Sequence, residues 1–116
     1  MRIRLTRDSV AAGDDVDAPH TRLIEIADVE TAHAVVDLVF DKLALAAISS
    51  GQATWGLKSN VMLAVVAQQW TAPRKLPWPG GTIQALAWSG DTLNVHAVYF
   101  AQLPPDVVFE VLRRAQ

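Results

Sequence analysis

A hairpin signal near the carboxyl end limits this chain to folds that contain an antiparallel sheet. Two apolar runs, TIQALAW at 82–88 and TLNVHAVYF at 92–100, flank the turn-forming tripeptide Ser-Gly-Asp. Pairing the runs around this tripeptide places alternate side chains on one face of the ribbon. We expect this face to pack on the core, with Asn94 and His96 on the opposite face. The predicted core-facing residues are Leu86, Trp88, Leu93, Val95 and Tyr99.

Four further segments carry the apolar pattern of strands. Residues 2–6 and 21–27 alternate apolar and polar side chains with the period of two that a half-buried strand requires. Residues 53–59 and 61–70 flank Ser59-Asn60 like the two strands of a second hairpin. The later of these runs also fits a short buried helix, but its valines and terminal tryptophan favour a strand.

Two segments are predicted as helices. Apolar residues recur at three- and four-residue spacing over 29–43, and Asp28 stands before them as the expected N-cap. Proline near the start and arginines in the last turn predict a second helix over 104–114. The stretches 7–20 and 71–81 are rich in residues that favour turns, so we expect two long loops.

The resulting order of elements, ββαββββα, predicts an α+β fold built on a mostly antiparallel sheet with two helices. A chain of 116 residues with half of them apolar fits a single domain spanning 1–116 with one core. Cysteine is absent, which excludes disulfides and thiol nucleophiles and fits a reducing compartment. We find no apolar run long enough for a signal peptide or a membrane span, and expect a cytoplasmic protein.

The charges are strongly segregated along the chain. Residues 8–41 hold nine acidic side chains against the single base Arg22, a net charge of −8, although the whole chain carries only −2. The block opens with RDSVAAGDDVDAPH at 7–20, in the first predicted loop. It continues along the first helix, where four polar residues project opposite the apolar stripe. These four are Glu30, His33, Asp37 and Asp41. Such a block is typical of a surface that meets a basic partner, although solvent-facing helix residues are normally charged.

Catalytic signatures are weak in this sequence. Asp8, Ser9 and His20 supply the residue types of a hydrolytic triad, but no nucleophile elbow surrounds them. Phosphate-binding glycine loops and the zinc-protease motif are absent, so no cofactor is expected. Direct binding of nucleic acid is disfavoured because the concentrated charge is negative.

Two alternatives to a binding role for the acidic block stay open. A divalent-metal- or ligand-binding domain, even an enzyme, could use an oxygen-rich set in the first loop, although the spacing is not that of a calcium loop. This set is Asp8, Asp14, Asp15, Asp17 and His20. A purely structural subunit is the other alternative, and an oligomer would be its expected state.

An inhibitor of a basic nuclease explains the charge block without any chemistry of its own, because carboxylates can stand in for nucleic-acid phosphates. Trp78, in a loop rich in proline and glycine, is the tryptophan least easily explained as core and could anchor the contact. The predicted partner-binding residues are Asp14, Asp15, Asp17, Glu30, Asp37, Asp41 and Trp78.

Three segments of the chain resemble small immunity proteins of bacterial polymorphic toxin systems, including contact-dependent growth inhibition. These are RDSVAAGDDVDAPH at 7–20, SSGQATW at 49–55 and AVVAQQW at 64–70. The resemblance implies a cytoplasmic, non-enzymatic protein that binds one cognate toxin domain, commonly a nuclease, and covers or distorts its active site. Residues 71–116 match no part of this family, and no functional residue is carried over from it.

Overall fold

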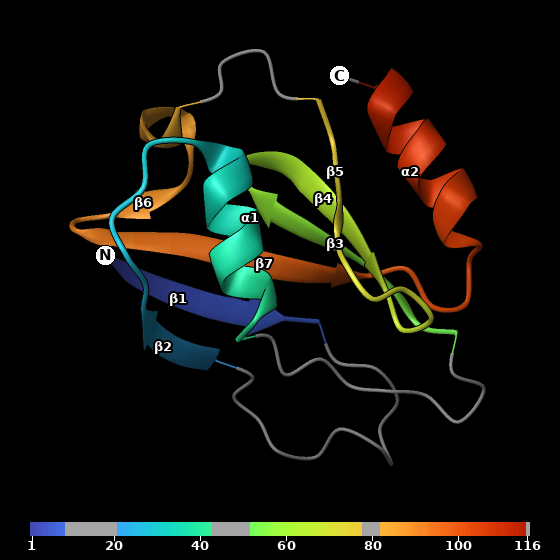
Figure 1. Ribbon diagram of the computed structural model, residues 1–116, viewed down its shortest axis with the longest axis horizontal. Coiled ribbons are helices and arrows are strands. Elements are labelled where there is room, and N and C mark those ends of the chain that lie inside the picture. Colours follow the sequence, from blue (N-terminus) through green and yellow to red (C-terminus); the bar gives the residue numbers. More distant parts are fainter. Residues whose placement is uncertain (9–20, 43–51, 78–81, 116) are drawn as a thin grey trace.

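The computed structural model describes residues 1–8, 21–42, 52–77 and 82–115. In these residues the chain forms a seven-stranded mixed sheet with two α-helices and one 3-10 helix, which confirms the α+β class (Figure 1). The strands lie in the order β2-β1-β7-β3-β4-β5, and β6 pairs with β7 beside this path. The elements are β1 (Arg2–Arg7), β2 (Thr21–Glu25), α1 (Ala32–Phe40), β3 (Thr54–Ser59), β4 (Val61–Ala67), β5 (Arg74–Lys75), η1 (Ile83–Ala85), β6 (Trp88–Ser89), β7 (Thr92–Tyr99) and α2 (Pro105–Arg114).

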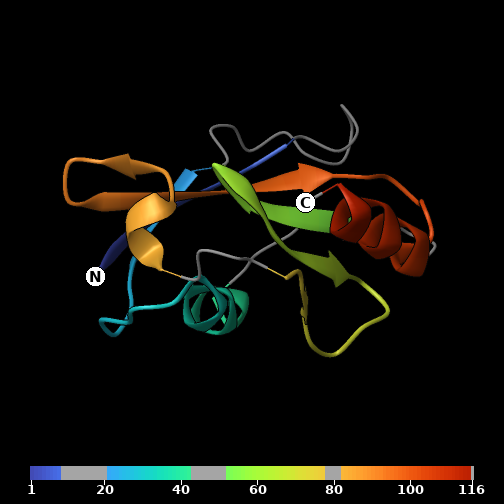
Figure 2. The ribbon, with the colours of Figure 1, turned by 90° about the horizontal axis from the view of Figure 1, so that it is seen from above.

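One pair of neighbouring strands, β1 beside β7, is parallel, and the other strand pairs are antiparallel. The period-two alternation of β1 and β7 turns their apolar residues toward α1, which covers this face of the sheet (Figure 2). The core therefore lies between α1 and the sheet. Its fully buried side chains include Ile3, Val35, Val36, Val39, Leu57, Leu63, Leu93 and Val95.

Helix α1 is shorter than the sequence predicts. Thr31, and not Asp28, is its N-cap, because the Thr31 hydroxyl accepts a hydrogen bond from the Ala34 amide at 3.2 Å. The helix ends at Phe40, with Asp41 as C-cap, so it covers less than the predicted 29–43. Glu30 consequently precedes the helix and does not belong to its exposed face.

The predicted hairpin at Ser59-Asn60 is confirmed. Strands β3 and β4 pair directly across Asn60, which adopts a φ of 65°. The second strand ends at Ala67 and not at Trp70, because the chain turns there and the Trp70 amide donates to the Ala67 carbonyl oxygen at 3.0 Å. The predicted loop over 71–81 contains the short strand β5, which adds two residue pairs to the edge of the sheet at β4. Prolines are compatible with such a short edge strand.

The segment 82–88 is not the strand that its alternation predicts. Only Trp88 and Ser89 pair with β7, and the preceding residues form η1. The Ile83 amide donates to the Glu30 carbonyl oxygen at 3.2 Å, so the start of this stretch bonds to the β2–α1 connection. The Ala87 carbonyl oxygen, next to β6, accepts the Asn94 amide of β7 at 2.8 Å. The tight turn itself is confirmed, with Gly90 at a φ of 62° where hairpin turns favour glycine.

Four of the five predicted core-facing residues of this hairpin are shielded. Leu86, Leu93 and Val95 are buried, and Tyr99 is half-buried against Trp55, with 4.7 Å between the ring centroids. Trp88 is the exception, with 36 % of its surface exposed. It stands at the end of the sheet, beyond the region that α1 covers.

Helix α2 is confirmed and contacts β4. Val108 is buried, whereas Val107 and Val111 on its other side are exposed. Neither helix of the described part of the chain is long and apolar enough to cross a membrane.

Candidate functional site

The acidic block is described at residue 8 and over residues 21–41. We call residues 21–41 the acidic segment; it holds five carboxylates and the single base Arg22, whereas its apolar residues in α1 are buried or half-buried. All five carboxylates are at the surface, and Asp28 is the most accessible of the three that form ion pairs, with 94 % of its side chain exposed. The five are Glu25, Asp28, Glu30, Asp37 and Asp41. The expectation that this block lies at the surface is confirmed for these residues.

Three of these carboxylates have cationic partners. Glu25 and Asp28 lie 3.5 and 3.1 Å from the amino group of Met1, and Glu25 also pairs with Arg2. Asp37 pairs with Lys75 of β5, with 2.7 Å between Oδ2 and Nζ. Glu30 and Asp41 form no ion pair with any residue in the described ranges. The uncompensated negative charge of the acidic segment therefore sits at the two ends of α1.

The predicted acidic face of α1 is shared with β5. The His33 ring contacts the Leu76 carbonyl oxygen through Nε2 at 2.8 Å, one residue after the Lys75 that pairs with Asp37. The segment 74–76 thus lies along the face that the sequence assigns to solvent. Lys75 neutralises part of the negative charge on this face of α1. The periodicity of residues 29–43 cannot predict this pair, because Lys75 lies in another part of the chain.

Several predicted site residues lie outside the described residues. Asp14, Asp15 and Asp17 of the first loop, together with Trp78 of the second, belong to this group. Ser9 and His20, which entered the triad and metal hypotheses, do so as well. The roles proposed for these residues stay predictions.

A hydrogen-bonded chain of three side chains joins β1 to β7, and sequence reasoning missed it. The Thr6 hydroxyl and His96 Nδ1 lie 2.7 Å apart, and His96 Nε2 lies 2.8 Å from Asp8 Oδ1. The second Asp8 oxygen accepts the Tyr99 amide at 2.9 Å. The sequence did place Thr6 and His96 on polar faces, but only the parallel register, which sets Thr6 beside His96, brings them together.

This arrangement keeps Asp8 ionised. Burial by itself raises the pKa of Asp8, but the hydrogen bonds from the Tyr99 amide and from His96 outweigh it, so the pKa lies below its ordinary value. Both oxygens of Asp8 are occupied, and the described residues contain no group of three histidine or acidic side chains that could hold a metal ion. Through these hydrogen bonds, the Thr6–His96–Asp8 chain ties the end of β1 to β7.

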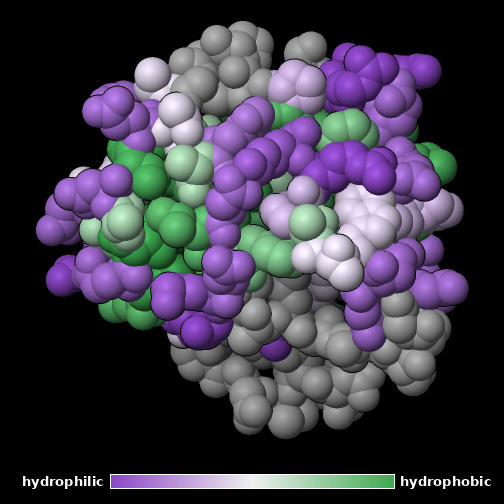
Figure 3. Space-filling model, viewed as in Figure 1, coloured by the Kyte–Doolittle hydropathy of each residue, from purple (hydrophilic) through white to green (hydrophobic). Residues whose placement is uncertain are grey.

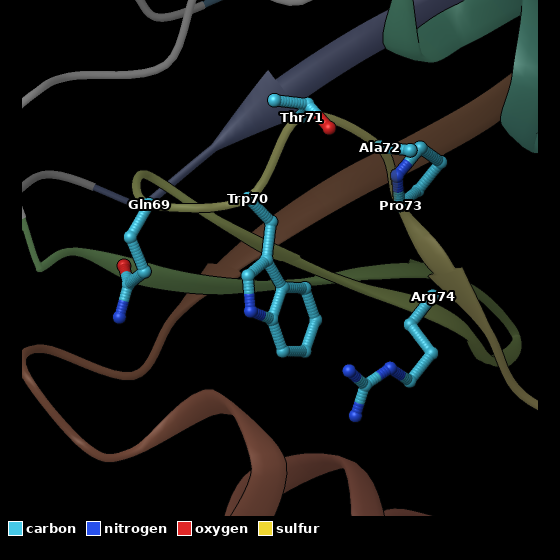
Figure 4. Close-up of a pocket in the computed structure, with 6 residues that line it drawn as sticks. All are labelled: Gln69, Trp70, Thr71, Ala72, Pro73 and Arg74. Carbon is cyan, nitrogen blue, oxygen red and sulfur yellow. The ribbon is translucent and has the colours of Figure 1, made fainter.

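A shallow pocket of about 370 Å³ lies in the β4–β5 connection, lined by residues 69–74 (Figure 4). The Arg74 guanidinium stacks 4.2 Å from the centre of the Trp70 ring and 5.3 Å from that of Phe109. It also donates to Asp106 at 2.8 Å. Because Arg74 contacts two residues of α2, this cluster attaches α2 to the edge of the sheet.

Comparison of the chain with protein-family models, with curated protein sequences and with solved structures yields no match.

Proposed function

We propose that this protein is a non-enzymatic immunity protein, which binds a basic toxin domain in the cytoplasm through its acidic segment and thereby neutralises it. The class of toxin that fits best is a nuclease, whose cleft is built to attract phosphates. Carboxylates presented to such a cleft give fast, electrostatically steered association.

The observation that carries this proposal is the placement of Asp41. A negative charge at a helix C-terminus is unfavourable by about 0.3–1 kcal/mol because it faces the negative end of the helix dipole. Asp41 is the C-cap of α1, and the last turn of α1 has no basic residue. The nearby Arg22 side chain donates to the Lys42 carbonyl oxygen and forms no ion pair with Asp41. The Asp41 carboxylate thus does not stabilise α1 through the helix dipole, which favours a role for this carboxylate toward a partner.

The unpaired state of Glu30 supports the same assignment. Its backbone carbonyl oxygen accepts the amide of Ile83, the first residue of η1, whereas its exposed carboxylate has no ionic partner among the described residues. An exposed, uncompensated carboxylate is available to a partner's arginine or lysine without breaking an existing contact. The resemblance of residues 7–70 to immunity proteins supplies the biological class.

The test is co-expression with the product of the gene immediately upstream. We expect rescue of growth and a co-purifying complex, and loss of both would overturn the proposal. In the purified complex, the double variant Glu30→Gln, Asp41→Asn should slow association roughly three- to tenfold at low salt.

The matched control neutralises two carboxylates of α2, Asp106→Asn with Glu110→Gln. It changes the net charge equally, but these carboxylates already pair with Arg74, Arg113 and Arg114. Association at the wild-type rate is expected for this control. Equal slowing by both double variants would mean that only net charge matters, and that the acidic segment is not the contact surface.

A further inference from the structure

One tryptophan is held at the surface in a fixed orientation. Trp88 pairs with Leu93 and therefore projects to the same side of the sheet as the core, yet 36 % of it is exposed. Its indole nitrogen donates to the Ile83 carbonyl oxygen at 2.8 Å. By contrast Trp55 is buried, and Trp70 lies under Arg74. An exposed aromatic ring with a fixed orientation loses little conformational entropy on binding.

Further apolar side chains come from the segments at the same end of the molecule. Val29, Ile83 and Met1 are partly buried against the core from three separate segments. We call these residues, together with Trp88, the Trp88 patch. The N-terminus, the connection 26–31, η1 and the β6–β7 turn meet at the same end of the molecule in Figures 1 and 2. Figure 3 shows an apolar area at this end, bordered by hydrophilic residues.

The rim of the Trp88 patch is acidic. Glu30 is joined to η1 through its backbone, and Asp91 lies in the turn after β6. Neither forms an ion pair with a described residue. Asp28 lies 3.1 Å from the amino group of Met1, and Glu25 lies 3.5 Å from it on the opposite face of the sheet, where it pairs with Arg2. Negative charge around an apolar centre selects a positively charged partner surface.

From this geometry we infer that Trp88 is the aromatic anchor of the docking surface for a basic protein partner. The surface that fits carries an arginine or lysine over the indole ring and further basic side chains opposite Glu30 and Asp91. Arginine is favoured at this place because its guanidinium stacks on indole and bonds to carboxylates at once. The inference rests on the proposed function, which it deepens by naming where the toxin domain would dock.

The first experiment needs no knowledge of the toxin. A random linear peptide library displayed on phage is selected against the immobilised full chain. We expect enriched peptides that combine arginine with apolar residues, and protection of 26–31 and 83–89 from amide hydrogen exchange when they bind. A library without binders, or protection confined to other segments, would overturn the inference.

Variants then test the anchor, with the selected peptides and with the upstream gene product. Trp88→Ala should weaken binding by at least about tenfold, as for an aromatic hot spot. The matched control is Val111→Ala, an exposed apolar residue on α2, which should stay within about twofold of wild type. Equal affinities for wild type and Trp88→Ala would contradict the inference.

If Trp88→Ala does not fold, the double variant Trp88→Phe, Glu30→Gln replaces it in the test. This variant keeps an apolar ring at position 88 and is therefore expected to fold. This pair should still weaken binding, and unchanged binding would count against the anchor. The outcomes also separate the two proposals. Peptides bound at Trp88 without any complex with the upstream product would overturn the toxin assignment alone. A toxin complex unaffected at Trp88 would overturn the anchor alone.

Discussion

Asp37 of α1 and Lys75 of β5 form an ion pair with 2.7 Å between carboxylate and ammonium, although 38 residues separate them. The pair joins the helix that covers the core to the edge of the sheet. It also removes one of the carboxylates of the predicted acidic face from the charge available to a partner.

We predict that breaking this pair has a small effect on stability. Both side chains are a third or more exposed, so Asp37→Asn should lower the free energy of unfolding by less than about 1 kcal/mol. A double-mutant cycle with Lys75→Met, measured by urea denaturation at low and high salt, isolates the coupling. Coupling that persists undiminished at high salt would contradict a surface pair.

The Asp8–His96 contact predicts a pH dependence. Because the pKa of Asp8 is lowered in the folded protein, its ionised form stabilises the fold above the unfolded pKa of about 4. This contribution is lost as the pH falls through the lower folded pKa. Wild type should therefore exceed Asp8→Asn in unfolding free energy near neutral pH, and the difference should shrink toward pH of about 3. A difference that stays constant over this range would show that Asp8 acts through packing alone.

Two leucines offer a matched test of the core. Leu93 in the centre of the sheet is fully buried, whereas Leu23 on the edge strand β2 is 60 % exposed. Leu93→Ala should cost about 2–5 kcal/mol, since it removes buried methyl groups and leaves a cavity. Leu23→Ala should change stability by less than about 0.5 kcal/mol. Thermal and chemical denaturation of both variants decides whether the assigned faces are correct.

The metal hypothesis has its own test. Magnesium or calcium bound only to the folded state would raise the melting temperature, and the stabilisation would grow with the logarithm of the free ion concentration above the Kd. We expect no shift on adding either ion and none on adding a chelator. A reproducible shift that disappears in the Asp14→Asn, Asp15→Asn, Asp17→Asn variant would restore the metal-binding alternative and weaken the immunity proposal.

Local sequence patterns predicted much of this fold. Alternation located β1, β2, β3 and β7, and helical spacing located α1. Proline near the start and arginines in the last turn located α2, and glycine in Ser-Gly-Asp located the β6–β7 turn. These features depend on neighbouring residues, whose spacing determines which side of an element is apolar. Some errors concerned element ends, such as the N-cap of α1, and the largest one arose where a distant segment supplied the partner. The sequence predicts a strand over 82–88, but η1 forms at Ile83–Ala85, where the Ile83 amide donates to the Glu30 carbonyl oxygen.

The sequence by itself determined the α+β class, the polar and apolar sides of most elements, and the concentration of acids before residue 42. The tertiary structure alone decided that β1 lies parallel to β7, that Lys75 reaches Asp37, and that Trp88 is exposed at the end of the sheet. The physical reason is that periodicity fixes the direction of a side chain within its own element. Strand order and long-range contacts depend instead on how all elements bury their apolar faces together.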